Sequence, residues 1–219
     1  YTIAQSESLI IDVSLDRSHL EGKYYDTLEI YFAQYNHSTE IILKSYLARF
    51  TELPGLNLPE ISRGTTAWGD YDGDGDLDVL LTGRYSIIDI TKLYKNIGND
   101  NFQQVVGLPF ANVMNSSAAW GDCDKDGDLD LFLSGYTDNG PISRIYKNEG
   151  DDLFTEMSFP FPNLESGAVA WGDYDNDGDL DILLSGMMSY QNYFTYIFKN
   201  AGDFDFNLIS TPNIPYLRK

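Results

Sequence analysis

Residues 67–78 have the sequence Ala-Trp-Gly-Asp-Tyr-Asp-Gly-Asp-Gly-Asp-Leu-Asp, and nearly the same sequence returns at 119–130 and 170–181. The tryptophans of the three copies are 52 and 51 residues apart. A second signature follows each copy at nearly the same distance. It comprises Leu-Tyr-Lys-Asn at 93–96, Ile-Tyr-Lys-Asn at 145–148 and Ile-Phe-Lys-Asn at 197–200. Self-similarity at a fixed period of this length predicts a repeat architecture.

Each repeat has the pattern of strands. Short apolar runs at 79–81, 131–133 and 182–184 are followed by glycine within two residues, as expected for strands buried on both faces. Aromatic and β-branched runs bounded by Gly, Asn and Asp supply the other strands. Four strands in about 40–50 residues form one blade of a β-propeller. The predicted fold is therefore all-β, a β-propeller of four-stranded antiparallel blades. Another repeated antiparallel architecture, such as a solenoid, is the alternative.

A ladder of phenylalanines extends the repeat toward the N-terminus. It comprises Phe50, Phe102, Phe154 and Phe206, each 52 residues after the last. A fourth unit is therefore expected, and its segment 28–33 aligns with 77–82. On that alignment Glu21, Lys23 and Tyr25 replace the loop aspartates, so we expect its ion site to be lost. The predicted organisation is one propeller-like domain over 1–219, with a degenerate first blade at 1–61 and blades with aspartate loops at 62–113, 114–165 and 166–219.

Each repeated loop places five aspartates at alternate positions within nine residues. Bare carboxylates this close raise one another's pKa and oppose folding, whereas a bound cation relieves the repulsion. Oxygen ligands suit Ca²⁺, while Zn²⁺ would take His or Cys ligands. We therefore predict three Ca²⁺ sites. Mg²⁺ or Mn²⁺ are other possible occupants, and acidic turns without metal are the alternative.

Position within the loop predicts how each aspartate contributes. Alternation directs the first, third and fifth side chains to the concave side, and glycine at the sixth position lets the chain turn. The seventh residue would offer its backbone carbonyl and the ninth its carboxylate. The twelfth residue is leucine, not the glutamate of an EF-hand, so we expect the ion to clip a β-hairpin. The predicted metal residues are Asp70, Asp72, Asp74, Asp76 and Asp78; Asp122, Asp124, Asp126, Asp128 and Asp130; and Asp173, Asp175, Asp177, Asp179 and Asp181.

The motif Asp-x-Asp-x-Asp-Gly-x-x-Asp between two strands resembles the FG-GAP repeats, also called VCBS-type repeats, of integrin alpha-subunit propellers and many secreted surface proteins. The resemblance covers residues 62–209 well and 1–61 weakly. It implies loop aspartates that bind Ca²⁺ at the edge of a blade, in an extracellular adhesion or recognition module. Propellers of this family commonly have seven blades. Four units leave open a small closed propeller, a fragment, or one piece of an assembly.

Composition excludes several classes of function. A formal net charge of −20 disfavours nucleic-acid binding, because phosphates select basic surfaces. A content of 42% hydrophobic and 14% aromatic residues is enough for a core, and no apolar run is long enough for a membrane-spanning helix. Fifteen of the 34 acidic residues lie in the three loops, so much of the charge belongs to the expected metal sites.

Some residues outside the aspartate set are also candidates. Trp68, Trp120 and Trp171 precede the loops, where they would either pack between blades or stack on sugar rings. Lys95, Lys147 and Lys199 are expected to pair with loop carboxylates. Cys123 replaces a tyrosine of the other loops and is predicted to be partly exposed.

The sequence favours an exported protein that is not an enzyme. Asn36 and Asn115 begin N-glycosylation sequons, and Asn115 falls in a predicted inter-blade linker. Nucleophile elbows, phosphate loops and zinc motifs are absent from the sequence. We expect a calcium-binding module, extracellular or at the cell surface, for adhesion, recognition or assembly of a surface structure. Its partners would be proteins or glycans, or further copies in a homo-oligomer or filament. The alternatives are a lectin that uses the tryptophans, and a non-catalytic part of a polysaccharide-active enzyme.

Overall fold

The computed structural model describes residues 25–35, 38–48, 58–189, 192–202 and 204–209. These residues form fourteen β-strands and no helix. Contacts divide the chain into two compact units, Tyr1–Pro54 and Gly55–Lys219. Within the described part, no helix has the length and apolar character needed to cross a bilayer.

The described part of the N-terminal unit is one antiparallel hairpin, β1 (Tyr25–Tyr35) and β2 (Ser38–Ala48). It contains segment 28–33, which aligns with 77–82 of the next repeat. The sequence predicted four units of four strands, whereas the described residues form three four-stranded sheets and this two-stranded one. Part of the alignment rested on Glu21, Lys23 and Phe50, which lie outside the described residues.

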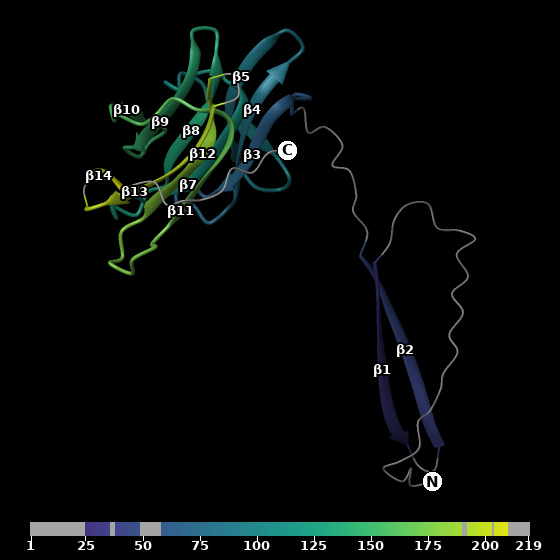
Figure 1. The fold of residues 1–219 in the computed structure, drawn as a ribbon. Helices are drawn as coiled ribbons and strands as arrows, with labels where there is room; N and C mark the ends of the chain where they lie inside the picture. Colours follow the sequence, from purple (N-terminus) through teal and green to yellow (C-terminus); the bar gives the residue numbers. More distant parts are fainter. Residues whose placement is uncertain (1–24, 36–37, 49–57, 190–191, 203, 210–219) are drawn as a thin grey trace. The chain divides into compact units, whose positions relative to one another are not determined.

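The second unit contains three four-stranded antiparallel sheets, each a meander of consecutive strands (Figure 1). The first sheet comprises β3 (Ser62–Gly69), β4 (Asp78–Tyr85), β5 (Ile88–Asn96) and β6 (Phe102–Gln104). The second comprises β7 (Met114–Gly121), β8 (Asp130–Thr137), β9 (Gly140–Asn148) and β10 (Phe154–Met157). The third comprises β11 (Glu165–Gly172), β12 (Asp181–Ser189), β13 (Asn192–Asn200) and β14 (Phe206–Ile209). The all-β prediction, with four strands in a repeat, is confirmed for these three units.

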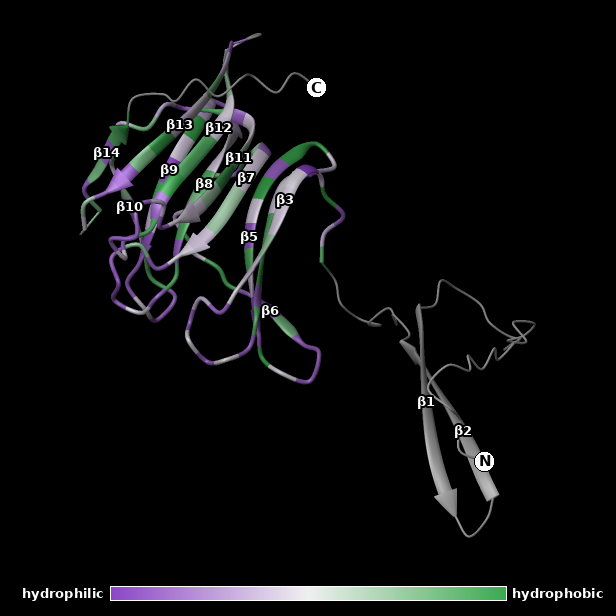
Figure 2. Ribbon diagram, turned by 60° about the horizontal axis from the view of Figure 1, so that its bottom comes forward, coloured by the Kyte–Doolittle hydropathy of each residue, from purple (hydrophilic) through white to green (hydrophobic). Residues whose placement is uncertain are grey.

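The second strand of each sheet carries the apolar run that the sequence analysis identified. Six consecutive residues are buried at the start of β4 and again at the start of β8. Side chains of a strand alternate between the two faces of its sheet, so these strands must be covered on both sides. Figure 2 shows the apolar central strands and the hydrophilic loops at one end of the sheets.

A β-bulge interrupts the first strand of every sheet at the same place. The register shifts between Ser62 and Thr65 in β3, and at the equivalent positions of β7 and β11. A non-glycine residue with positive φ lies in each bulge: Arg63, Asn115 and Ser166. The glycosylation candidate Asn115 therefore lies within strand β7. Its prediction as a linker residue was wrong, because strand pairing resumes immediately around the bulge.

Neighbouring sheets pack face to face through two aromatic cores. The first core joins the first and second sheets and includes Tyr71, Leu80, Leu131 and Tyr146. The second core joins the second and third sheets and includes Phe132, Phe161 and Ile182. The first strands β3, β7 and β11 lie next to one another (Figure 2). Because each interior face meets another sheet, the repeats form a stacked series.

Candidate metal centres

Each acidic loop connects the first and second strands of its sheet and closes on its own first aspartate. The backbone amide of the sixth-position glycine donates to Oδ2 of that aspartate in all three loops. The pairs are Gly75 with Asp70 at 3.0 Å, Gly127 with Asp122 at 3.2 Å, and Gly178 with Asp173 at 3.0 Å. These glycines have φ between 90° and 100°, a conformation that other residues rarely adopt. The predicted turn at the sixth position is confirmed.

The closed loops bring several carboxylates to one point. In each loop, three aspartates offer oxygens that lie within 4.8 Å of one another. The groups are Asp70, Asp72 and Asp78; Asp122, Asp124 and Asp126; and Asp173, Asp175 and Asp181. Only oxygen donors converge there, which is the donor set that Ca²⁺ prefers.

Two of these oxygens show that the loops fit a cation. Oδ1 of Asp70 and Oδ1 of Asp122 are buried, and neither has a hydrogen-bond partner. A buried carboxylate oxygen without a partner is costly unless a positive charge lies beside it. Both belong to first-position aspartates, which are members of the converging groups and whose other oxygen accepts the amide of the loop glycine. The residues therefore fit an oxygen-coordinated divalent ion.

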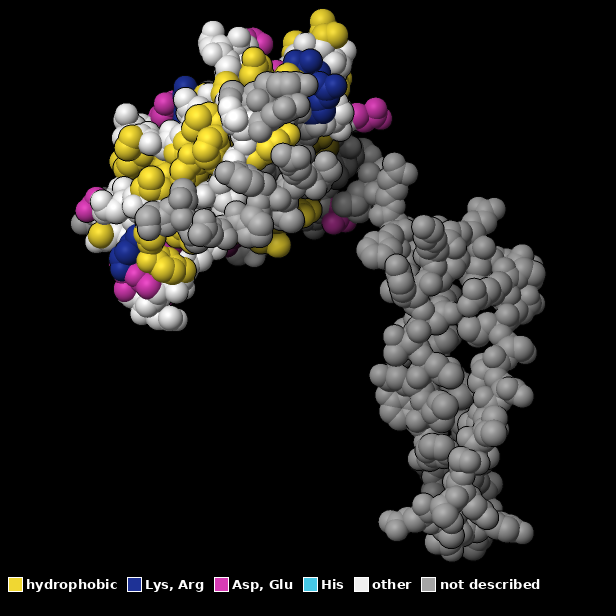
Figure 3. Space-filling view, viewed as in Figure 1, with side chains coloured by type: hydrophobic (Ala, Val, Ile, Leu, Met, Phe, Trp, Pro, Cys, Tyr) yellow, Lys and Arg dark blue, Asp and Glu magenta, His cyan; other side chains and the backbone are white. Residues whose placement is uncertain are grey.

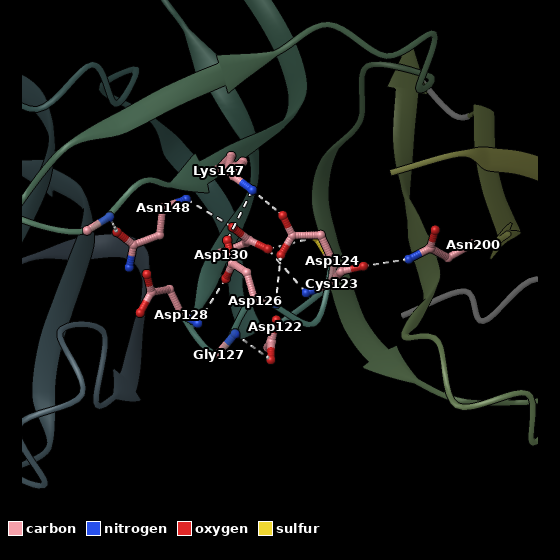
Figure 4. A network of polar contacts seen from close by, with 11 residues as sticks. Asp122, Cys123, Asp124, Asp126, Gly127, Asp128, Asp130, Lys147, Asn148 and Asn200 are labelled. Atoms are coloured by element: carbon pink, nitrogen blue, oxygen red, sulfur yellow. Dashed lines mark hydrogen bonds and ion pairs between the residues drawn. The ribbon is translucent and has the colours of Figure 1, made fainter. Parts of the chain in front are cut away.

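The ninth-position aspartates also hold the loop to the sheet. Each accepts one amide from the start of the loop and one from the asparagine that ends the third strand. In the second sheet, Asp130 Oδ2 accepts from Cys123 N at 3.1 Å, and Oδ1 accepts from Asn148 N at 2.9 Å (Figure 4). Asp78 and Asp181 make the same pair of bonds in their own sheets. Burial raises the pKa of both Asp78 and Asp130 to about 6, although these amides oppose the shift.

A lysine from the third strand of each sheet reaches into the loop, as the sequence predicted. Lys147 Nζ is ion-paired with Asp124 and lies 3.0 Å from Asp126 Oδ2 (Figure 4). Lys95 pairs with Asp72 and lies 3.5 Å from Asp74, and Lys199 repeats the arrangement in the third loop. The hydrogen bonds that Lys147 and Lys199 donate to the loop carboxylates raise the pKa of both lysines above the ordinary range. The ammonium group therefore neutralises the third and fifth aspartates.

The remaining loop aspartates lie at the rim. Asp74 and Asp177 each accept the backbone amide two residues on, at 3.0 Å, through Oδ1. The seventh-position residue Asp76 is exposed, and Asp128 borders the groove between the first two sheets. The carboxylate of Asp179 instead forms an ion pair of 2.6 Å with Lys125 of the second loop. This contact between neighbouring loops was not predicted from the sequence.

The tryptophans have two kinds of surroundings. Trp120 stacks on Tyr71 with ring centroids 6.2 Å apart, across the junction of the first and second sheets. Trp171 donates from Nε1 to the backbone oxygen of Ala119 at 3.1 Å, across the next junction. Trp68 is 60% exposed. Trp120 and Trp171 therefore pack between sheets, as one of the two predictions expected, whereas the ring of Trp68 lies at the surface.

Two further candidates differ from expectation or are only partly placed. Cys123 is 1% exposed, so its predicted partial exposure was wrong. Its side chain turns into the core between sheets, where Sγ donates to Asp130 at 2.9 Å and burial raises the pKa of the thiol. The side-chain amide of Asn115 donates to Glu165 at 3.1 Å. Asn36 lies outside the described residues.

An asparagine follows each of the three lysines that reach into the loops, and no role was predicted for it from the sequence. Asn148 Nδ2 donates to the backbone oxygen of Tyr71, in the loop of the preceding sheet, at 2.7 Å. Asn200 donates in the same way to Cys123 at 2.8 Å (Figure 4). These two residues tie the second and third sheets to the acidic loop of the sheet before each. Their recurrence at a constant offset from the loop was the available signal.

The fold and the loops define an all-β repeat protein in which every four-stranded sheet carries one acidic loop. Residues 70–133 and 122–184 match the model of the FG-GAP-like repeat. Together the matches span residues 70–184, more than half of the 219 residues, so the chain belongs to the FG-GAP-like repeat family. The resemblance inferred from the sequence is confirmed.

One similar solved structure is that of an Agrocybe aegerita lectin, described as recognising non-reducing terminal N-acetylglucosamine. It is 18% identical with a TM-score of 0.46, over 75% of this chain and 42% of the lectin chain. The chain thus spans less than half the length of that lectin. No curated protein matches the chain.

Proposed function

We propose that this chain is a non-enzymatic, calcium-binding β-propeller module that acts outside the cell or at the cell surface in adhesion, recognition or assembly. The observation that carries the calcium proposal is the pair of buried, unpartnered oxygens on Asp70 and Asp122 within converging carboxylate groups. Stacked four-stranded sheets with adjacent first strands, together with FG-GAP-like repeats, support the propeller. The partners we propose are proteins or glycans at a cell or filament surface.

The chemistry of the proposed ion supports an extracellular location. Extracellular modules bind Ca²⁺ with dissociation constants of about 10⁻⁴–10⁻³ M, and such sites fill where calcium is abundant. The metal would then join each loop to its sheet without any disulfide, which the single Cys123 could not form within one chain. Occupied loops would stabilise the edge of each blade, where partners are met.

Calorimetric titration tests the proposal. We expect three Ca²⁺ per chain for the unmodified protein. The double substitution Asp122→Asn and Asp124→Asn should remove one of them, because it removes two converging carboxylates and leaves the other loops intact. Glu60→Gln, which removes one exposed carboxylate outside the loops, is the matched control and should still bind three. Absence of any calcium heat, with a melting temperature unchanged by chelator, would overturn the proposal. Turnover of acidic polysaccharides would overturn its non-enzymatic part.

Calcium affinity should fall below pH 6, while metal-free stability follows the opposite trend. Protons compete with the metal at Asp78 and Asp130, whose pKa is about 6. For each pH unit below this pKa, calcium affinity should fall roughly tenfold. Without metal, the folded protein holds these protons more tightly than the unfolded chain. Stability from these groups is therefore present near pH 4 and lost as pH rises through 6. Thermal melts with calcium and with chelator should show opposite slopes between pH 4 and 6, and equal slopes would contradict this assignment.

Lys147→Met should raise calcium affinity at the second loop by about five- to tenfold. The ammonium group pairs with Asp124 and Asp126, so a bound ion must displace it. The same substitution should lower the stability of the metal-free protein, because the two carboxylates lose their counter-charge. Titration calorimetry and chelator melts measure the two effects. Lys92→Met removes the same charge from β5 and should change neither; equal effects of both substitutions would show a general charge effect.

A further inference from the structure

The junction between sheets is built in the same way twice. Gly69 has no side chain, and the ring of Trp120 occupies the gap that this leaves. A Cβ at this glycine would lie 2.7 Å from Trp120 Cδ1. Gly121 receives Trp171 in the same way, at 2.8 Å. An asparagine amide from the later sheet also reaches a loop carbonyl of the earlier one. Each junction thus joins a tryptophan face to a glycine face.

The third sheet carries the glycine face without a tryptophan in it. Gly172 occupies the position of Gly69 and Gly121, yet a Cβ there would meet nothing within 4 Å. Tyr174 is 51% exposed, whereas its equivalents Tyr71 and Cys123 are each 1% exposed. Leu183 is 45% exposed, whereas its equivalents Leu80 and Phe132 are fully buried. Apolar side chains come to the surface over β12 and β13 (Figure 3).

The first sheet carries the complementary tryptophan face. Trp68 is 60% exposed, whereas Trp120 and Trp171 are partly buried against the preceding sheets. Asn96 donates to Leu77 within its own sheet, at 3.2 Å. Asn148 makes the same bond and, in addition, the one across the junction. Among the described residues, the first sheet therefore presents the half of a junction that the third sheet lacks.

We propose that the tryptophan face of one copy of this chain binds the glycine face of a second copy. Trp68 would enter the gap at Gly172 as Trp120 enters the gap at Gly69. The contact continues a junction that the chain already makes twice, and it would cover Tyr174 and Leu183 at the same time. It joins different surfaces of two copies, so it propagates into a ring or an open filament according to the rotation per copy. This inference deepens the assembly part of the proposed function and does not depend on calcium binding.

Complementary substitutions in the full chain test the proposal. Gly172→Val fills the gap on a strand, where valine is well accommodated, and should abolish self-association without lowering the melting temperature. Trp68→Ala should weaken self-association by about 30-fold, the scale of a tryptophan hot spot. Light scattering over a range of concentrations measures both. Gly121→Val is the matched control, because it places the same side chain against Trp171 within the chain and should reduce folding stability.

Mixing the two variants gives the sharpest outcome. The Trp68→Ala copy retains its glycine face, and the Gly172→Val copy retains its tryptophan face. At a concentration too low for the weakened contact of Trp68→Ala, a head-to-tail contact therefore predicts that each variant alone is monomeric. Their mixture at the same concentration should form a one-to-one dimer which grows no further. An unmodified chain that stays monomeric at every concentration, or association that both substitutions leave unchanged, would overturn the inference. A calcium titration of Gly172→Val reports separately on the metal proposal, because its loops are intact.

Discussion

Removing calcium should lower the melting temperature of the three-sheet unit by about 15–30 °C. An ion that binds only the folded state adds about 2.7 kcal/mol per site at one hundred times its dissociation constant, so three sites add about 8 kcal/mol. For a unit of this size, each kcal/mol changes the melting temperature by about 2–4 °C. The loops justify the assumption of folded-state binding, because their carboxylates converge only when the glycine turn and the strand pairing are in place.

Differential scanning calorimetry with calcium and with chelator measures the effect. The double substitution at Asp122 and Asp124 provides the internal control, since it should remove about one third of the calcium-dependent increase. Magnesium at the same concentration should give a smaller increase, because it needs a stricter octahedral arrangement. A melting temperature that does not respond to calcium would show that the lysines alone hold the loops.

Trp120→Ala should reduce the free energy of unfolding by about 3–5 kcal/mol, the range for loss of a packed aromatic side chain. The ring of Trp120 packs on Gly69, Tyr71 and Phe154 between two sheets, so its removal leaves a cavity that the rigid strands cannot close. Trp68→Ala changes the same residue of the preceding repeat. Because Trp68 is largely exposed, we expect a change within about 1 kcal/mol, measured on monomeric protein.

Urea unfolding of the two variants separates packing from sugar binding. If Trp120 were a sugar platform, Trp120→Ala would lose glycan binding and keep its stability. A large loss of stability for Trp120→Ala beside a small one for Trp68→Ala would establish the packing role of the repeated tryptophan. Equal losses would show that Trp68 is also covered in solution.

Local sequence was sufficient to predict the repeat, the strands and the loop turn. The strand at β4 and the turn at Gly75 depend on residues close to them in the sequence, so a short sequence pattern is enough to predict both. The family resemblance was confirmed for the same reason, because it rests on a short motif with fixed spacing. The calcium itself stays a prediction, supported by the free oxygens of Asp70 and Asp122.

The features missed from the sequence all depend on contacts between repeats. Cys123 was expected to be partly exposed, but the third sheet packs over it. The residues near Cys123 in the sequence give no indication of this contact. The bond from Asn148 to Tyr71 joins residues 77 positions apart. The prediction of a fourth, degenerate unit at 1–61 relied on weak local similarity, and the described residues there form a hairpin. Local sequence patterns therefore predicted the strands and loops better than they predicted which residues of neighbouring repeats contact one another.

The glycine–tryptophan junction has a consequence for how genes of this kind change length. Each repeat brings a tryptophan that fits the glycine before it and a glycine that receives the tryptophan after it. A duplication of one period, as from Trp68 to Ala119, would insert a sheet that matches both of its new neighbours without any compensating mutation. Deletion of one period would leave an equally well-matched joint. Unequal recombination between repeats thus produces foldable chains, and the number of sheets can vary while every junction stays the same.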